Sequence, residues 1–330
     1  MIYMLKKRFY ILLFFCLLLG GNVNSSTVDK GDNNAPFENK RTETDYLPIA
    51  DPFVMLYNNK YYAYGTGGTV SEGFACFSSD DLKNWKRERQ ALSADDSYGK
   101  WGFWAPEVYY IQSKKKFYMF YSVEEHICVA TSDSPVGPFR QESKQPIWEE
   151  KSIDTSLFID DDGTPYLYFV RFTDGNVIWV AQMTDDLMKI KKETLSECIK
   201  AEEPWELLQA KVAEGPSLLK KNGVYYLIYS ANHYENKGYG VGYATSDTPM
   251  GPWVKYSKNP LLQGDAATGL VGTGHGAPFQ CKDGSWKYIF HAHWSAAEIQ
   301  PRTSYIKDFA ISDQGVVTIS GAVIKPRVLK

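Results

Sequence analysis

The sequence KVAEGPSLLKKNGVYYLIYSA, residues 211–231, contains the pattern on which the fold prediction rests. A Gly-Pro corner precedes the short apolar run SLL, and Asn222-Gly223 separates that run from the alternating, aromatic-rich run VYYLIYS. Asn-Gly supplies the positive φ angles that a two-residue hairpin turn needs. The stretch therefore predicts two short antiparallel strands, with Glu214 at the entrance of the first one. Taken alone, an acid at such a corner is more often a solvated loop residue than a catalytic one.

Four further copies of this pattern occur along the chain. Each copy has a corner, often with proline, then a short apolar strand, a polar turn and a second strand rich in Tyr and Phe. They begin at Asp51 (DPFVMLYNNKYYAYGT), Ala105 (APEVYYIQSKKKFYMFYS), Asp154 (DTSLFIDDDGTPYLYFVR) and His275 (HGAPFQCKDGSWKYIFHAH). Aligned on their corners, the copies place Pro52, Pro106, Ser156, Pro216 and Pro278 in equivalent positions, separated by 54, 50, 60 and 62 residues.

Each first hairpin is followed by a second, whose first strand ends in a polar turn, as in ICVATSDSPVGPF at residues 127–139. Four-stranded units that repeat at roughly 40–60 residues are typical of β-propellers. The sequence therefore predicts an all-β, five-bladed β-propeller over residues 46–330, with four antiparallel strands per blade. A β-sandwich gives no reason for a fivefold recurrence, and the coils of a parallel β-helix are much shorter than this unit.

The N-terminal residues have the pattern of a secretory signal. Lys6, Lys7 and Arg8 precede the apolar run 9–19, which is too short to span a bilayer comfortably. We expect residues 1–21 to be a signal peptide and the polar residues 22–45 to be a disordered linker. The chain is then exported to the periplasm, the extracellular space or the cell surface, without stable membrane insertion. Cys16 lacks the small residues expected before a lipidated cysteine, and its lipidation stays open.

The composition narrows the class of partner. The net charge of −3 over 330 residues is too small to indicate a nucleic-acid partner. The 23 Tyr and 9 Trp suit β-strands, and they also suit the apolar faces of sugar rings. The four cysteines after the signal have no metal-site spacing and are expected to be free thiols: Cys76, Cys128, Cys198 and Cys281.

The entrance corners are the candidate active site, because the first strand of each blade lines the central channel of a propeller. Five side chains are therefore expected around one cavity: Asp51, Trp104, Asp154, Glu214 and His275. Three carboxyl groups in a common pocket repel one another unless they have partners or share a proton. Glycoside hydrolysis needs such a set, with one protonated acid for the leaving oxygen and one carboxylate for water. A third carboxylate raises the pKa of the acid.

At these residues the chain resembles glycoside hydrolase family 43, a family of five-bladed β-propellers that shares its clan with family 62. The motifs that carry the resemblance are IADPFVML, SIDTSLFID, VAEGPSLLKKNGVYYLIYSA and GTGHGAPF, and it extends over about residues 46–327. It implies an inverting mechanism with Asp51 as general base, Asp154 as pKa modulator and orienter, and Glu214 as general acid.

The resemblance also implies substrate contacts from Trp104, His275 and Arg302. Arg302 matches more loosely, because the family more often has Gly before this arginine and an acidic residue after it. No cofactor is expected to be required, and a calcium or other ion near His275 at the propeller axis stays open. A zinc hydrolase that uses His275, His291 and His293 is an alternative, but no carboxylate motif accompanies the His-x-His spacing.

We therefore expect an exo-acting glycosidase that removes terminal sugars from an arabinose- or xylose-containing plant glycan. An α-L-arabinofuranosidase is the first expectation. A β-xylosidase, a galactosidase or an endo-arabinanase of the same family stays an alternative, as does a non-catalytic sugar-binding propeller. The last of these has no reason to keep all three of Asp51, Asp154 and Glu214.

Overall fold

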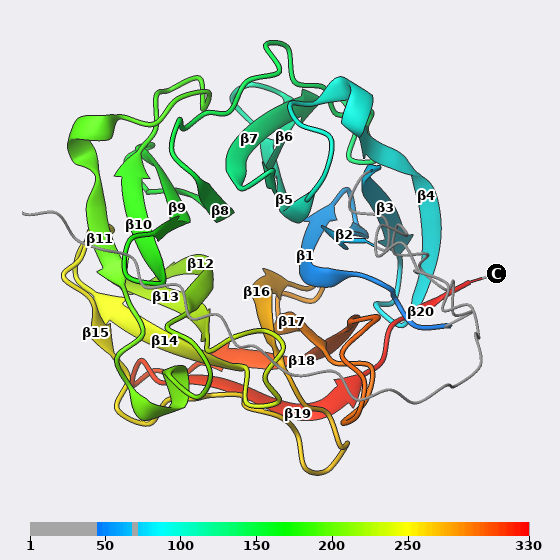
Figure 1. Cartoon of the computed structure of the whole chain (residues 1–330). Helices are drawn as coiled ribbons and strands as arrows, with labels where there is room; N and C mark the ends of the chain where they lie inside the picture. The colour runs from blue at the N-terminus through cyan, green and yellow to red at the C-terminus, as the bar shows by residue number, and fades with distance from the viewer. Residues whose placement is uncertain (1–44, 68–71, 330) are drawn as a thin grey trace, which may run out of the picture. The chain divides into compact units, whose positions relative to one another are not determined.

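The computed structural model describes residues 45–67 and 72–329, and the predicted signal peptide and nearly all of the predicted linker lie outside these ranges. The described residues form five sheets around one axis, which confirms the all-β, five-bladed propeller (Figure 1). Apart from the C-terminal strand β20 (Arg327–Val328), which joins the first sheet, each sheet is built from strands that are consecutive in the chain, so each blade corresponds to one copy of the sequence repeat.

Blade 1 contains β1 (Ala50–Tyr57), β2 (Lys60–Thr66), β3 (Gly73–Ser79) and β4 (Asn84–Ser93). Blade 2 contains β5 (Trp104–Ile111), β6 (Lys116–Val123) and β7 (His126–Ser132). Blade 3 contains β8 (Ser152–Ile159), β9 (Pro165–Phe172), β10 (Asn176–Gln182) and β11 (Ser196–Ile199). Blade 4 contains β12 (Ala213–Lys221), β13 (Val224–Ala231), β14 (Gly240–Ser246) and β15 (Val254–Lys255). Blade 5 contains β16 (Gly274–Gln280), β17 (Trp286–Ala292), β18 (Thr303–Ile311) and β19 (Val317–Ile324).

Two blades depart from the four-stranded pattern. In blade 2 the fourth position is reduced to isolated bridges, one of which joins Thr131 and Arg140. In blade 1 a fifth strand, β20 (Arg327–Val328), pairs in parallel with β4. The helical content of the described residues is limited to the 3₁₀ turns η1 (Ala94–Asp96), η2 (Lys192–Thr194) and η3 (Pro204–Glu206).

The hairpin turns follow from the local sequence. Asn222 and Gly223 have φ angles of 52° and 81°, and they connect β12 to β13 through the pair Lys221 and Val224. Asn58 and Asn59 make the equivalent turn in blade 1. Two consecutive positive φ angles match the right-handed twist of the flanking strands, which is why Asn and Gly are found there.

The five inner strands line the axis, each in contact with its neighbours around the ring (Figure 1). Every inner strand has a register shift at its corner. At each shift one residue has a positive φ angle, as in a β-bulge that re-aims a side chain. These bulge residues are Asp51, Ala105, Asp154, Gly215 and His275.

The bulges correct the sequence alignment of the corners. The residues that follow the bulges are Pro52, Pro106, Thr155, Pro216 and Gly276. Ser156 and Pro278 were therefore aligned one and two residues too late, because the bulge defines the corner and proline only accompanies it. Trp104 and Glu214 lie one residue before their bulges, whereas Asp51, Asp154 and His275 lie in them.

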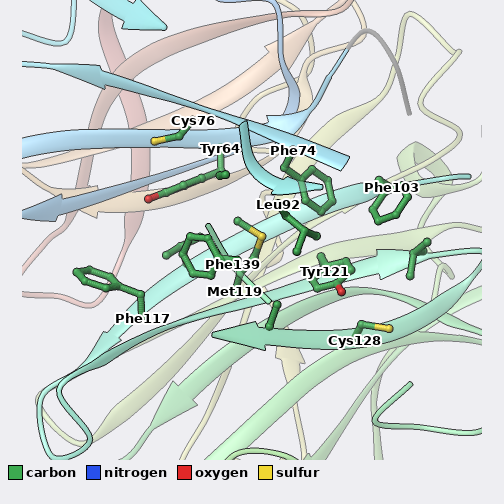
Figure 2. Packing of buried hydrophobic residues seen from close by; sticks show 14 of the residues in the cluster. Tyr64, Phe74, Cys76, Leu92, Phe103, Phe117, Met119, Tyr121, Cys128 and Phe139 are labelled. Atoms are coloured by element: carbon green, nitrogen blue, oxygen red, sulfur yellow. The ribbon is translucent and has the colours of Figure 1, made fainter. Parts of the chain in front are cut away.

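Apolar clusters fill the spaces between neighbouring blades and hold the corners in place. Figure 2 shows the cluster between blades 1 and 2, in which Phe74 lies edge-to-face with Tyr121, with ring centroids 5.5 Å apart. Aromatic pairs of this geometry add to the free energy gained from burying their area. Cys76 and Cys128 lie in the same cluster. The four described cysteines are all free, as the sequence predicted.

The ring closes where the two ends of the propeller sequence meet. The Leu47 amide donates to the carbonyl oxygen of Pro326 at 3.0 Å, next to β20. The Ser304 hydroxyl of blade 5 donates to the carbonyl oxygen of Ile49 at 2.7 Å, immediately before β1. These bonds fix the start of β1, and with it Asp51, against blade 5.

Candidate active site

A pocket of about 380 Å³ lies at the entrance corners of the blades. All the site residues predicted from sequence line it: Asp51, Trp104, Asp154, Glu214, His275 and Arg302. The other residues around it are Glu125, Ile153, Phe172, Asn176, Val212, His233 and Tyr234. A larger hollow of about 570 Å³, lined by Trp148 and Lys192 among others, contains none of the predicted site residues. The chemistry therefore belongs to the smaller pocket.

Asp51 is surrounded by hydrogen-bond donors and positive charge. Its Oδ1 accepts from Arg302 Nη1 at 2.9 Å, and its Oδ2 accepts from the Thr66 hydroxyl at 2.6 Å. His275 Nδ1 lies 3.4 Å from Oδ1. Burial opposes ionisation of this carboxyl, but Arg302 and the neighbouring imidazoles outweigh it and hold its pKa well below the usual range. Asp51 is therefore a carboxylate at neutral pH.

His291 belongs to the site in a role beside Asp51, whereas the sequence suggested it only as a possible metal ligand. It is fully buried, and its Nδ1 accepts the Asp51 backbone N–H at 3.1 Å. Burial and the charge of Arg302 lower its pKa to about 3, so this imidazole is neutral and supports Asp51 through hydrogen bonding. The antiparallel hairpin explains its position, because the end of β17 returns to the corner of β16 and pairs His291 with Gly274.

His293, unlike His291, contacts a loop and not Asp51. Its Nε2 lies 2.8 Å from the carbonyl oxygen of Tyr234, in the loop between β13 and β14. The ring of Tyr234 lies against the guanidinium of Arg302, with 4.5 Å from Cζ to the ring centroid. His293 therefore anchors the loop that supports Arg302, and the His-x-His spacing serves two hydrogen bonds to the protein itself.

Asp154 is held by two backbone-related hydrogen bonds. Its amide donates to the Ser122 hydroxyl of blade 2 at 2.9 Å, and its Oδ2 accepts the Gly215 N–H at 3.3 Å. His275 Nδ1 lies 3.8 Å from the same Oδ2. Burial and the charge of Asp51 raise the pKa of Asp154 to about 8, against the lowering effects of Gly215 and Arg302.

Glu214 has neutral partners. The Tyr239 hydroxyl donates to its Oε1 at 2.8 Å, and Asn176 Nδ2 donates to its Oε2 at 2.9 Å. Burial and the charge of Asp154 raise the pKa of Glu214 to about 7. Sequence reasoning missed Tyr239 and Asn176, because Asn176 begins β10, Tyr239 is the loop residue before β14, and neither has a motif around it.

The position of Glu214 before its bulge has a steric reason. The bulge residue of blade 4 is Gly215, and a Cβ atom there would lie 2.9 Å from the ring of His275. A side chain there would push against the His275 ring and would also need a positive φ angle, which favours glycine, and the carboxyl group of this blade comes from the preceding residue. Glu214 thus reaches the pocket from the residue before its bulge, whereas Asp51 and Asp154 reach it from the bulge itself.

The three carboxyl groups have different protonation states. Asp51 is ionised, whereas Asp154 and Glu214 are buried neighbours with raised pKa values. Two such groups titrate as a pair, so the pair retains a proton near neutral pH. The pocket therefore contains a carboxylate and a carboxylic acid together, which is the pairing that acid–base hydrolysis of a glycosidic bond requires.

Aromatic side chains form part of the pocket wall. Trp104 packs edge-to-face with the exposed Trp101, with 6.4 Å between ring centroids. Phe172, at the end of β9, is 44% exposed beside the pocket. Exposed aromatic rings at a pocket rim suit the apolar faces of sugars.

The described ranges 45–67 and 72–329 bear on two further features, metal binding and membrane spanning. Within them, no group of three or more His, Cys, Asp or Glu side chains is arranged to hold a metal ion. No helix in this part of the chain is long and apolar enough to cross a membrane.

The fold and the pocket define a propeller glycosidase with an acid–base carboxyl site. The chain belongs to glycosyl hydrolases family 43, whose model matches residues 47–317. A crystal structure described as endo-1,4-β-xylanase from Bacteroides thetaiotaomicron VPI-5482 is 91% identical, with a TM-score of 0.86 over 87% of this chain and 99% of that chain.

Two curated relatives are more distant. The β-D-galactofuranosidase of Aspergillus niger is 28% identical over 268 residues, which cover 74% of this chain and 74% of the relative. The arabinoxylan arabinofuranohydrolase of Bacillus subtilis is 29% identical, over 74% of this chain. The match spans only 55% of that second relative.

Proposed function

We propose that this glycosidase releases terminal α-L-arabinofuranosyl units from arabinoxylan-type glycans with inversion of the anomeric carbon. The observation that carries the proposal is the pocket of about 380 Å³ in which the ionised Asp51 faces the proton-retaining pair Asp154 and Glu214. A cavity of this size suits a small ligand and favours recognition of a chain end.

The environment of each carboxyl group supports its proposed role. Asp51, ionised beside Arg302, is the general base that takes a proton from the attacking water. Glu214, whose pKa is raised to about 7, is the general acid that protonates the leaving oxygen. Asp154 is the modulator, because its charge raises the pKa of Glu214. Trp104, His275 and Arg302 are proposed to contact the terminal sugar, which is consistent with their position on the pocket wall.

The names of the two curated relatives support a furanoside substrate. One is a galactofuranosidase and the other an arabinofuranohydrolase. β-D-Galactofuranose and α-L-arabinofuranose present the same arrangement of ring substituents and differ in the exocyclic group. A pocket that accepts one ring is therefore well suited to the other.

A second candidate is endo-1,4-β-xylanase, the activity in the description of the 91% identical structure. Cleavage inside a xylan chain requires sugars on both sides of the scissile bond, so the polysaccharide would have to cross the pocket mouth. The two candidates differ in their first products, which are free arabinose for the first and xylo-oligosaccharides for the second.

The deciding experiment incubates the enzyme with arabinoxylan and with unbranched xylan, and identifies early products by chromatography. Arabinose from arabinoxylan alone supports the proposal, and xylo-oligosaccharides from both substrates overturn it in favour of the xylanase. The remaining family activities are tested with linear arabinan and with aryl α-L-arabinofuranoside, β-D-xyloside and β-D-galactoside substrates. NMR of the first-formed anomer tests inversion. The Glu214→Gln variant, prepared in parallel, controls for contaminating activity.

We further propose that the chain is exported and that turnover needs no cofactor. Ca²⁺ takes six to eight oxygen ligands, and the carboxyl oxygens beside His275 already have partners in Arg302, Thr66 and Gly215. These residues alone do not form a calcium site. Turnover that is unchanged after dialysis against a chelator supports this, and recovery of lost activity by one added metal contradicts it. The mass of the mature secreted protein tests cleavage near residue 21.

A further inference from the structure

A repeated contact between neighbouring blades holds the bulges in place. The acceptor lies on the second strand of one blade, and it pairs across the sheet with the residue just before that blade's bulge. The donor is the bulge amide of the next blade. Four pairs follow this rule: Ala105 N–H to Thr66 Oγ1 at 3.0 Å, Asp154 N–H to Ser122 Oγ at 2.9 Å, His275 N–H to Ser230 Oγ at 2.8 Å and Asp51 N–H to His291 Nδ1 at 3.1 Å.

Blade 3 breaks this rule at Val170. Val170 pairs with Ile153, in the same register position as the four acceptors, but its side chain cannot accept a hydrogen bond. It is fully buried and packs in the apolar cluster that includes Ala213, the residue before Glu214. The bulge amide of the next blade, that of Gly215, donates to the Asp154 carboxylate instead, at 3.3 Å. The one missing acceptor thus coincides with the one bulge amide that binds a carboxyl group of the site.

We propose that Val170 is a positioning residue for the acid–base site, because its aliphatic side chain reserves the Gly215 N–H for the Asp154 carboxylate. A hydrogen bond to a carboxylate favours its charged form. The Gly215 hydrogen bond thus lowers the pKa of Asp154, against burial and the charge of Asp51, and shifts the shared proton toward Glu214, where the leaving oxygen needs it. This inference rests on the proposed roles of these two residues.

Other ionisable groups around Asp154 set the background for this effect. Asp51 faces it from β1 and raises its pKa, and Arg302, which precedes β18, lowers it. His275 faces it from β16, at 3.8 Å. Glu107 of β5 is partly buried, and desolvation, with the charge of Asp154 as a smaller cause, raises its pKa to about 8. None of these groups changes when Val170 is replaced, so the Gly215 hydrogen bond is the variable that the substitution isolates.

The test is Val170→Thr, which keeps the branched shape and adds an acceptor where Thr66 has one in blade 1. The Gly215 N–H then turns to the new hydroxyl, and the pKa of Asp154 rises. A neutral Asp154 repels the Glu214 carboxylate less, so the pKa of Glu214 falls and the acid is lost at lower pH. We expect the basic limb of kcat against pH to shift to lower pH by about one unit, so that kcat is roughly tenfold lower above neutral pH.

Two readouts separate this effect from general damage. The loss should be large for a phenyl glycoside and nearly absent for a 2,4-dinitrophenyl glycoside, whose leaving group needs no proton. The ¹³C shift of the Asp154 carboxyl should titrate at higher pH in the variant. This titration does not depend on catalysis, so it tests the hydrogen-bond exchange even if Glu214→Gln stays active and the proposed roles fail.

The matched control is Val170→Ala, which removes packing without adding an acceptor. It should lower stability but leave the pH limb and the Asp154 titration where they are in the unmodified enzyme. If Val170→Thr does not fold, Val170→Ser against Val170→Ala makes the same comparison, because the two differ by one hydroxyl group. The proposal is overturned if the added hydroxyl changes neither the Asp154 titration nor the basic limb of the kcat–pH profile.

Discussion

Asp51 and Glu214 are both 8% exposed, yet the pocket gives them opposite protonation. The partners of Asp51 include the guanidinium of Arg302 at 2.9 Å, and its pKa is held well below the usual range. Glu214 has only the neutral donors Tyr239 and Asn176 at hydrogen-bond distance, with Asp154 as a repelling neighbour, and its pKa is raised to about 7. Burial opposes ionisation in both cases, so the charge of the neighbours decides the outcome.

One repeated corner thus produces two chemical roles. The blades supply similar backbone positions, and the side chains from adjacent strands assign the proton. Base and acid are therefore distinguished by Arg302 on one side of the pocket and by Asp154 on the other.

The largest expected effect comes from removing each carboxyl group in turn. Glu214→Gln and Asp51→Asn should each lower kcat by about 10²–10⁴-fold, the usual contribution of a general acid or base. Only Glu214→Gln should regain most of its activity on a 2,4-dinitrophenyl glycoside, because only the acid acts on the leaving group. Steady-state kinetics with phenyl and dinitrophenyl substrates measure this. An equal dependence on the leaving group in both variants contradicts the assignment.

Replacing Arg302 should make Asp51 more like Glu214. In Arg302→Met the carboxyl group stays buried but loses its cation, so the acidic limb of kcat/KM should rise by about one to three pH units. Arg302→Lys keeps the charge and should retain most of the low pKa. Both variants also lose the proposed guanidinium contact to the substrate, so KM should change in both, and only the position of the acidic limb tests the pKa of Asp51. A limb that stays in place in Arg302→Met shows that another group sets the pKa of Asp51.

A smaller effect is expected for Tyr239→Phe. The Tyr239 hydroxyl stabilises the charged form of Glu214, so its loss raises the pKa of that carboxyl group further. The basic limb of kcat should move to higher pH, with a change in kcat of about threefold to tenfold. Tyr239 also stacks on His291, with 5.7 Å between centroids, and the Phe ring preserves that contact. A limb that moves to lower pH contradicts the hydrogen-bond argument.

The smallest expected effect is on stability. A carboxyl group with a raised pKa binds a proton more tightly in the folded state, so folding loses stability as pH rises from the unfolded pKa, about 4.3, to the folded value, about 7 for Glu214. Glu214→Gln removes this penalty. Its Tm should exceed that of the unmodified enzyme by a few degrees at about pH 8, and by less at about pH 5. Calorimetry at both pH values measures the difference, and an equal gain at both contradicts this origin.

Local pattern was sufficient to predict the architecture. Asn-Gly and similar turn residues, apolar alternation and the fivefold recurrence each depend on residues close together in the chain, and they predicted the hairpins, the blades and the convergence of the corners. The family resemblance added the roles of Asp51, Asp154 and Glu214, which remain predictions. The pocket brings these residues together with Trp104, His275 and Arg302.

The remaining features depend on contacts between blades, which no local pattern encodes. His291 lies 240 residues from Asp51 in the chain and was considered only as a metal ligand, yet it accepts the Asp51 amide. Asn176 reaches Glu214 from β10 of blade 3, and Tyr239 reaches it from the loop before β14 of its own blade. Bulges also shift the register by one residue, so Glu214 and Asp51 occupy different positions in their corners.

The five similar hairpin pairs, the propeller they form and the acids at three of its corners follow from the sequence, because turns and strands depend on neighbouring residues. Which acid is ionised and which keeps a proton depends on the folded ring. Arg302 precedes β18 of blade 5, and Val170 and Gly215 lie on opposite sides of a blade interface. The electrostatic field at a carboxyl group is the sum over such neighbours in space, and it exists only once the ring has closed.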